Sequence, residues 1–177
     1  MYKIDKLIKA ENQLYHTNDL AILWGISNRN TLYTTIKRYV SRGVLLPIHK
    51  GLYATVPLSQ LDPLELGRAI IHRYCYLSAE SVLAQAGVIA QVTYPYTFVS
   101  SVSQKISLDS ISYFVRKLKD EFLMNPVGIT LQNGVLTATP ERAAADLLYF
   151  DHQYHFDFPG TLDLENVKDI QKEVGYI

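Results

Sequence analysis

The sequence predicts an α+β protein in two parts, a small helical part ending in a hairpin and a larger part that mixes helices with an antiparallel sheet. Apolar residues recur at helical spacing up to residue 42, and residues 92–138 then favour β-strands. The charge changes as well. Residues 1–60 carry eight basic and three acidic side chains (net +5), and residues 61–177 carry nine and fourteen (net −5). We place the boundary between residues 58 and 59.

Composition excludes several classes of protein. Hydrophobic residues make up 48% of the 177 residues and charged residues 19%, so the chain can bury a core and does not resemble a disordered protein. The longest uncharged stretch, Ser81 to Gln104, is too polar for a membrane span, which needs about 20 mainly apolar residues. The N-terminus has no signal-peptide core, and Cys75 is the only cysteine. We expect a soluble, cytoplasmic protein without internal disulfides.

Three helices are expected in the first part. The apolar spacing of residues 4–8 predicts a short one. A second begins at residues 17–19 (Thr-Asn-Asp), where a hydroxyl and a carboxylate suit a helix N-terminus, and it ends at Gly25. Ser27 is expected to cap a third helix from about Asn28 to Arg42. Two helices joined by a short turn of this kind are typical of a helix-turn-helix.

The third helix has two distinct sides. Leu32, Ile36, Tyr39 and Val40 fall on one side and, with Trp24, form the expected core of the first part. The opposite side carries amides, hydroxyls and cations but no carboxylate, as a helix needs in order to meet phosphates and base edges in the major groove of DNA. Its members are Asn30, Thr34, Lys37, Arg38 and Ser41, with Tyr33 at the edge.

A β-hairpin follows this helix. Residues 44–49 and 52–56 favour strands and flank a turn at Lys50-Gly51. A hairpin directly after a recognition helix is typical of a winged helix, so residues 1–58 are predicted to bind double-stranded DNA. The alternative is a small domain that uses its hairpin only for packing. The predicted DNA contacts are Ser27, Arg29, Asn30, Thr31, Tyr33, Thr34, Lys37, Arg38 and Lys50.

Residues 59–177 are expected to form the mixed second domain. The predicted helices cover residues 63–72, 79–86, 140–150 and 164–174, with N-caps at Asp62, Ser78 and Thr139. The predicted strands cover residues 97–102, 112–118, 128–131 and 135–138, and Asn133-Gly134 is the strongest hairpin turn. On the last helix, residues 167, 170 and 174 should face inward.

The sequence contains no recognisable reaction centre. Nucleophile-elbow, phosphate-loop and dinucleotide motifs are missing. His152 and His155 could bind a metal on a helix, but their aromatic and proline-containing surroundings favour a polar surface loop. The charged residues 163–168 favour a solvated helix face over a nuclease centre, and Cys75 favours a buried small residue over a nucleophile. We therefore predict a binding protein without enzymatic activity, cofactor or metal.

Four stretches together resemble the AbiEi family, the antitoxins of bacterial type IV abortive-infection systems. They are Thr31-Leu32-Tyr33, Lys50-Gly51-Leu52-Tyr53, residues 76–83 (YLSAESVL) and residues 138–149 (ATPERAAADLLY). The last stretch is the most specific, and the resemblance runs in order over roughly residues 15–150. None of the four is an active-site signature.

The resemblance implies a function. Members of the family pair a DNA-binding domain that represses their own operon with a second domain that counteracts a nucleotidyltransferase toxin encoded beside them. The same roles are expected here, with residues 1–58 binding the promoter and residues 59–177 acting as the antitoxin domain. The first alternative is a winged-helix regulator whose second domain senses a small ligand or mediates oligomerisation, and an apolar cavity in the β-rich region would favour it. The last alternative is an enzyme of unrecognised type, which would need a cleft with convergent acidic groups in residues 61–177.

Overall fold

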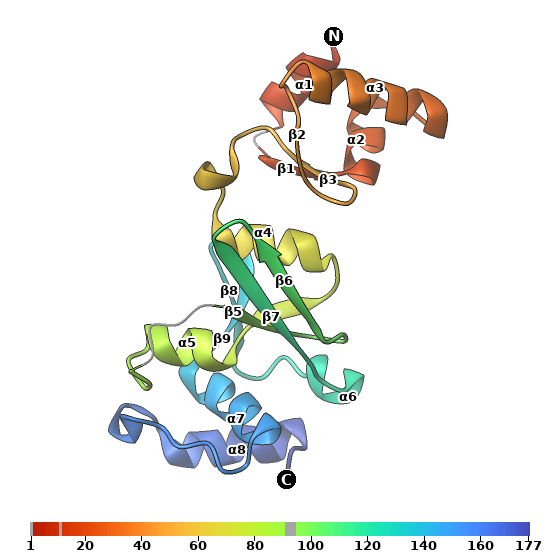
Figure 1. Cartoon of the computed structure of the whole chain (residues 1–177). Coiled ribbons are helices and arrows are strands. Elements are labelled where there is room, and N and C mark those ends of the chain that lie inside the picture. The colour runs from red at the N-terminus through yellow and green to blue at the C-terminus, as the bar shows by residue number, and fades with distance from the viewer. Residues whose placement is uncertain (1, 11, 91–94) are drawn as a thin grey trace. The chain divides into compact units, whose positions relative to one another are not determined.

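The computed structural model describes residues 2–10, 12–90 and 95–177 and contains two compact units (Figure 1). Unit 1 comprises residues 1–70 and unit 2 comprises residues 71–177, so residues 59–70 fall in unit 1 and the division lies beyond the expected boundary at 58/59. Helices and strands occur in both units, which confirms the predicted α+β class. Within the described residues, no helix is long and apolar enough to cross a membrane.

Unit 1 has a winged-helix-like fold. Its antiparallel sheet has the strand order β1-β3-β2, and the β2–β3 hairpin is the predicted wing. The sequence pattern does not predict β1, because this strand has only three residues and its partner β3 lies far along the chain. The elements are α1 (Lys3–Lys9), β1 (Leu14–His16), α2 (Thr17–Trp24), α3 (Arg29–Ser41), β2 (Leu46–His49) and β3 (Leu52–Ala54).

The predicted core of unit 1 is confirmed. Leu32 and Ile36 on α3 are buried together with Trp24 on α2. Tyr39 and Val40 are half-buried and pack against this core, and the Tyr39 ring stacks on the Trp24 ring with centroids 5.2 Å apart. These contacts fix the rotation of α3 about its own axis.

Two of the predicted helix caps in unit 1 are wrong by one residue. Asn28, not Ser27, caps α3, because its Oδ1 accepts a hydrogen bond from the Thr31 backbone N–H at 3.0 Å. At the start of α2, Thr17 is already helical, and the Asp19 carboxylate accepts from the His16 N–H at 2.8 Å. An N-cap side chain must reach the free N–H groups of the first turn, and only one position does so.

The helix that follows the wing begins as predicted. After a short 3₁₀ turn (Leu58–Gln60), the Asp62 Oδ1 accepts from the N–H groups of Leu64 and Glu65 at 2.8 and 2.9 Å. Helix α4 (Pro63–Ile71) then starts with proline at its first position, where no N–H is required.

Unit 2 is built on a six-stranded sheet of order β6-β7-β5-β4-β9-β8. The β6–β7, β4–β5 and β8–β9 pairs are antiparallel, and the β5–β7 and β4–β9 pairs are parallel, so the sheet is mixed and not wholly antiparallel as predicted. The β8–β9 hairpin is confirmed, whereas β4 and β6 were not among the predicted strands. The predicted turn at Asn133-Gly134 joins β8 to β9, with φ values of 47° and 81°. The strands are β4 (Cys75–Leu77), β5 (Tyr96–Ser100), β6 (Gln104–Leu108), β7 (Ile111–Lys117), β8 (Ile129–Gln132) and β9 (Val135–Ala138).

The helices of unit 2 pack on one another through α7. Helix α7 (Pro140–Phe150) packs against both α5 (Ala79–Gln85) and α8 (Leu164–Val174), and α5 packs against β5. A short helix, α6 (Asp120–Leu123), precedes β8, and a 3₁₀ turn (Pro159–Thr161) precedes α8. The bounds of α7 and α8 match the prediction, and α8 buries Val167, Ile170 and Val174 as expected.

Candidate nucleic-acid interface

All nine side chains predicted to contact DNA are solvent-exposed in unit 1. Seven of them lie on α3, Ser27 precedes this helix, and Lys50 lies in the turn between β2 and β3. The exposed fraction of Tyr33 is 52%, so its ring is open to solvent although it is aromatic. Exposure is a condition that any contact with a nucleic acid must meet.

Helix α3 turns one face to the core and the other to solvent. Leu32 and Ile36 are buried. Thr35 is also buried, and its hydroxyl donates a hydrogen bond to the Thr31 carbonyl at 2.8 Å. The opposite face consists of exposed polar and basic side chains, which are Asn30, Thr34, Lys37, Arg38 and Ser41. The polar face is therefore held outward by the packing of the apolar one.

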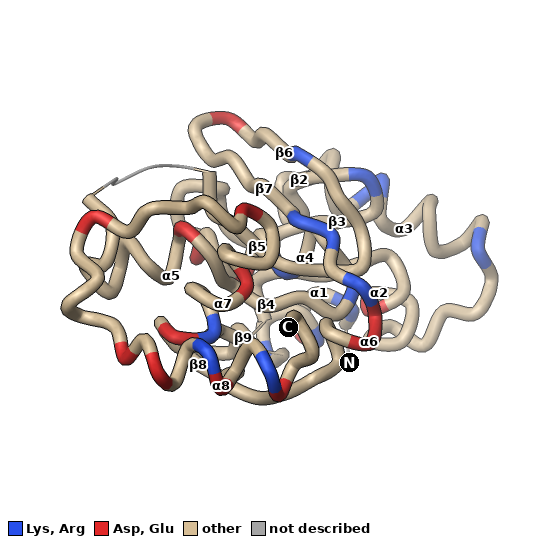
Figure 2. Tube along the Cα trace, turned by 90° about the horizontal axis from the view of Figure 1, so that it is seen from below, with Lys and Arg blue, Asp and Glu red and all other residues tan. Residues whose placement is uncertain are grey.

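The exposed face of α3 is electrostatically suited to a polyanion. The helix carries Arg29, Lys37 and Arg38, and Figure 2 shows no Asp or Glu along it. The whole of unit 1 contains nine basic and five acidic side chains, which gives it a net charge of +4. Cations without neighbouring carboxylates remain free to approach phosphates.

The start of α3 is held by a local polar cluster. The Asn28 Oδ1 accepts from the Thr31 N–H and also from the Thr31 hydroxyl at 3.2 Å. Thr31 therefore stabilises the helix start as well as lying on the exposed surface. Asn28 is itself exposed, and the sequence prediction of DNA contacts omitted it.

The wing is fixed at its turn. The Gly51 carbonyl accepts a hydrogen bond from the Thr17 N–H at 2.9 Å and a second from the Thr17 hydroxyl at 3.3 Å. Gly51 has φ +75°, a conformation that favours glycine. His49 and Lys50 are both exposed beside it, and His49 is a second surface residue that the sequence prediction omitted.

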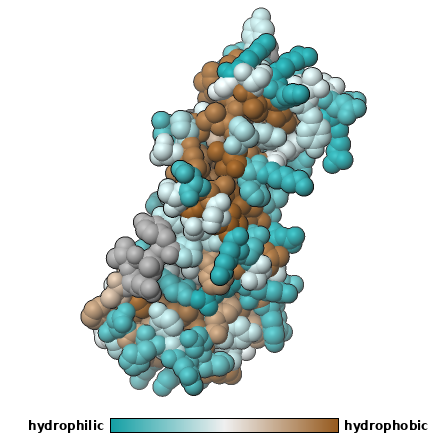
Figure 3. All heavy atoms as spheres, viewed as in Figure 1, coloured by the Kyte–Doolittle hydropathy of each residue, from teal (hydrophilic) through white to brown (hydrophobic). Residues whose placement is uncertain are grey.

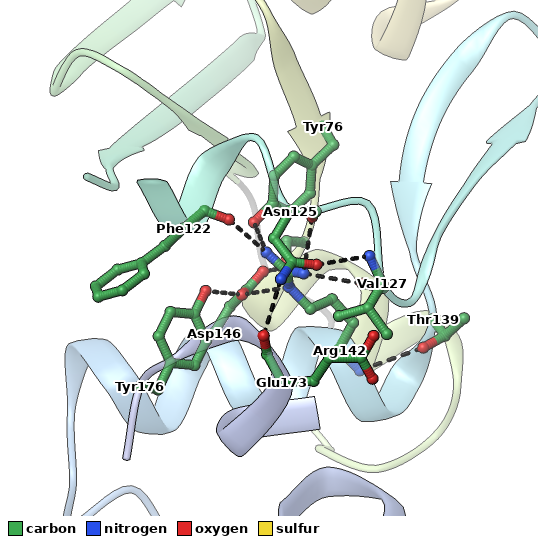
Figure 4. A network of polar contacts seen from close by, with 10 residues as sticks. Tyr76, Phe122, Asn125, Val127, Thr139, Arg142, Asp146, Glu173 and Tyr176 are labelled. Carbon is green, nitrogen blue, oxygen red and sulfur yellow. Dashed lines mark hydrogen bonds and ion pairs between the residues drawn. The ribbon is translucent and has the colours of Figure 1, made fainter. Parts of the chain in front are cut away.

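Unit 2 also contains a polar cluster, but this cluster is buried, unlike the exposed polar residues of α3 (Figure 4). Arg142 and Asp146 lie one turn apart on α7, and neither side chain has exposed surface. The Arg142 Nε donates to the Asp146 Oδ1 at 2.8 Å. A buried ion pair is retained only when its remaining hydrogen-bonding groups also find partners, so the surroundings of the pair decide its role.

Arg142 uses its guanidinium donors on four further acceptors. Its Nη1 donates to the carbonyls of Asn125 and Val127 at 3.2 and 2.8 Å. Its Nη2 donates to the Tyr76 hydroxyl at 3.0 Å and to the Phe122 carbonyl at 3.2 Å. One side chain thereby joins α7 to β4 and to the segment between α6 and β8.

Asp146 is satisfied by two hydroxyls besides Arg142. The Ser78 hydroxyl donates to Oδ2 at 2.7 Å, and the Tyr176 hydroxyl donates to Oδ1 at 2.5 Å. Ser78 occupies the predicted N-cap position of α5, but its side chain bonds Asp146 and does not cap the helix. Burial and the Asp146 carboxylate raise the pKa of the Tyr76 and Tyr176 hydroxyls, so both keep their protons.

This network joins α7 to β4 and to Tyr176, just after α8. Gly128 shows how closely it is packed, because a Cβ at this position would lie only 2.7 Å from the Arg142 Cβ. Tyr76, Ser78, Arg142 and Asp146 all belong to the stretches that resemble the AbiEi family. These four residues hold unit 2 together through one buried network.

The remaining candidate residues are Cys75, His152, His155 and the charged residues 163–168. Cys75 is buried, as expected of a small core residue. His152 and His155 are exposed, and the described part of the chain contains no group of three His, Cys, Asp or Glu side chains that could hold a metal ion. Asp163 caps α8 by accepting from the N–H groups of Glu165 and Asn166.

Solved structures that are similar to the chain include one that matches nearly its whole length. It is the crystal structure of the RV2827C protein from Mycobacterium tuberculosis, with a TM-score of 0.61 and 12% sequence identity, and the match covers 96% of this chain and 69% of that one. No protein-family model matches the sequence, and no curated protein matches it significantly. The chain therefore shares the fold of the mycobacterial protein, an α+β fold with a winged-helix-like unit followed by a mixed six-stranded sheet.

Proposed function

We propose that unit 1 binds double-stranded DNA with α3 in the major groove and the wing beside the phosphate backbone. The observation that carries this proposal is the exposed, carboxylate-free face of α3, which the buried Leu32 and Ile36 hold outward. A recognition helix reads base edges near its N-terminus, while cations further along it and on a wing contact phosphates. Arg29 and Asn30 would take the first role, and Lys37 and Lys50 the second.

We further propose that the protein is a cytoplasmic autorepressor and antitoxin that binds its own promoter and counteracts a nucleotidyltransferase toxin encoded in the same operon. The support is the resemblance to the AbiEi family over both units. It is strengthened by the finding that the resembling residues of unit 2 form one network rather than scattered matches. On this proposal the chain acts by binding and catalyses no reaction.

The charge of unit 2 suits the antitoxin role. Residues 140–177 carry eight acidic and three basic side chains, and the buried Arg142–Asp146 pair accounts for one of each. Seven acidic and two basic side chains remain, a net charge of −5. A nucleotidyltransferase must present basic groups to its nucleotide and RNA substrates, so an acidic surface is electrostatically complementary to it.

A separation-of-function experiment tests both roles in the full chain. The double variant Arg29→Ala/Lys37→Ala, produced from an unrelated promoter, should no longer repress a reporter driven by the protein's own promoter. It should still protect growth when the neighbouring toxin is co-expressed. Loss of protection together with repression would contradict an antitoxin role for unit 2, and full repression by the variant would contradict the DNA-binding role of α3.

The alternative, a regulator whose second domain senses a ligand, places an apolar cavity in the β-rich region. Two open grooves of about 390 and 260 Å³ lie in unit 1, the first beside α1 and the second beside β1 and α2. Hydrophobic residues reach the surface of this unit (Figure 3), with exposed fractions of 74% for Ile8 and 81% for Ile22. These grooves do not favour the ligand-sensing role over the antitoxin role.

A further inference from the structure

We infer that Thr17 is a positioning residue for the wing lysine Lys50, an inference that rests on the proposed DNA binding by unit 1. Thr17 is the first residue of α2, and both its backbone N–H and its hydroxyl donate to the carbonyl of Gly51. Gly51 directly follows Lys50 in the turn of the wing. The contact therefore ties the tip of the wing to the first helix of the helix-turn-helix.

The wing needs such a contact because its strands are short. Strand β2 has four residues and β3 has three, and the register between them shifts before His49. The β1–β3 pairing ends at His16 opposite Leu52. Thr17 continues this pairing by one residue onto Gly51, beyond the last strand residue, and so extends the support of the sheet into the turn.

The contact also sets where Lys50 lies relative to the recognition helix. At its other end, α2 packs against α3 through the stacked rings of Trp24 and Tyr39. Thr17 and Trp24 are thus the two ends of one rigid helix, with the wing joined to the first end and α3 to the second. A lysine held in place loses less conformational freedom on binding a phosphate than one on a mobile turn.

The test is the salt dependence of binding to a fluorescently labelled, mixed-sequence DNA duplex, measured by anisotropy on the full chain. Lys50→Ala should lower the slope of log K against log salt by about 1, as expected for one lost phosphate contact. Thr17→Val keeps the side-chain shape and the backbone N–H but removes the hydroxyl donor. It should weaken binding several-fold and reduce the slope in the same direction, by at most the Lys50→Ala amount.

Two further variants separate positioning from a general loss of stability. Thr17→Ser retains the hydroxyl and should restore both the affinity and the slope. In the Lys50→Ala background, Thr17→Val should have no additional effect, because the lysine it positions is already missing. Thr55→Val removes a hydroxyl elsewhere in the same unit and is the matched control, and Trp24 fluorescence reports whether each variant is folded. Thr17→Ala serves if the valine variant does not fold.

The outcomes distinguish the inference from the function on which it rests. If Lys50→Ala lowers the slope and Thr17→Val leaves it unchanged, DNA binding stands and the positioning role of Thr17 is wrong. An equal effect of Thr17→Val with and without Lys50 would also overturn it. If the wild-type protein shows no salt-dependent binding to the duplex, the proposed function itself fails.

Discussion

Helix α3 of unit 1 and helix α7 of unit 2 place charged side chains in opposite environments. Unit 1 exposes Lys37 and Arg38 on α3, whereas unit 2 buries Arg142 and Asp146 on α7. The exposed cations stay hydrated and available to a partner. Desolvation of an unpaired charge would cost several kcal/mol, so the buried arginine persists only because neighbouring acceptors surround it. The buried pair therefore serves the fold of unit 2, whereas the exposed cations of α3 are available for the DNA binding proposed for unit 1.

Removal of one member of the buried pair should have the largest effect. Asp146→Ala leaves Arg142 without its counter-charge, and we expect the free energy of unfolding of unit 2 to fall by about 3–5 kcal/mol. Trp24 is the only tryptophan and lies in unit 1, so its fluorescence follows that unit alone. In a urea titration, the circular-dichroism transition should move to lower urea while the fluorescence transition stays in place.

An exposed ion pair in unit 2 provides the control. Asp169 and Lys172 on α8 are 3.4 Å apart, with side chains 74% and 65% exposed. Asp169→Ala should leave both transitions unchanged, because exposed ion pairs add little to stability. Equal losses from Asp146→Ala and Asp169→Ala would show that burial does not distinguish the two pairs.

A substitution in the core of unit 1 should instead change the stability of unit 1. Ile36→Ala should lower the stability of unit 1 by about 2–5 kcal/mol, the range for truncation of a large buried side chain. The Trp24 fluorescence transition should now move to lower urea, and DNA binding should be lost because unit 1 unfolds. An unchanged fluorescence transition would mean that α3 is rotated differently from the structure.

A smaller loss is expected from Tyr176→Phe, which removes one donor to Asp146. Hydrogen bonds to charged groups contribute about 1.5–3 kcal/mol. The raised pKa of Tyr176 adds a pH dependence, since the unfolded chain releases this proton near pH 10 and the folded chain retains it. The stabilisation is therefore present below pH 10 and is lost as the pH rises further. The wild-type protein should lose more stability above pH 10 than Tyr176→Phe, and parallel pH profiles would contradict this assignment.

At the proposed DNA interface, Asn30→Ala should weaken binding to the protein's own promoter by about 1–3 kcal/mol, the usual contribution of a base-specific contact. Binding to a mixed-sequence duplex should change little. Asn166→Ala, an exposed asparagine on α8 in unit 2, is the matched control and should change neither. Equal losses on both duplexes would make Asn30 a backbone contact.

Local signals predict much of this fold. The Thr139 cap with Pro140 defines the start of α7, and Asn133-Gly134 defines the β8–β9 turn, because these residue types impose a backbone conformation on their neighbours. The three-residue strands β1 and β4 could not be predicted in the same way. Their stability comes from partners distant in sequence, which no local pattern records.

The two candidate sites also differ in how far local sequence predicts them. The exposed face of α3 follows from helical periodicity, so Asn30, Thr34, Lys37, Arg38 and Ser41 could be predicted to lie on the surface. The network around Arg142 joins residues far apart in sequence, and nothing near Tyr176 indicates its bond to Asp146. One signal was available, namely an arginine and a carboxylate at i and i+4 in an alanine-rich helix segment, where an ion pair must be buried if its neighbours are.

The most direct test of the central claim compares one lysine from each unit in the salt-dependence measurement. Lys37 lies on the exposed face of α3, and Lys168 is an exposed lysine on α8. Lys37→Ala should lower the slope of log K against log salt by about 1 and weaken binding to all sequences alike, while Lys168→Ala should leave the slope at the wild-type value. Equal slopes for wild type and Lys37→Ala, or a reduced slope only for Lys168→Ala, would contradict the assignment of DNA binding to α3.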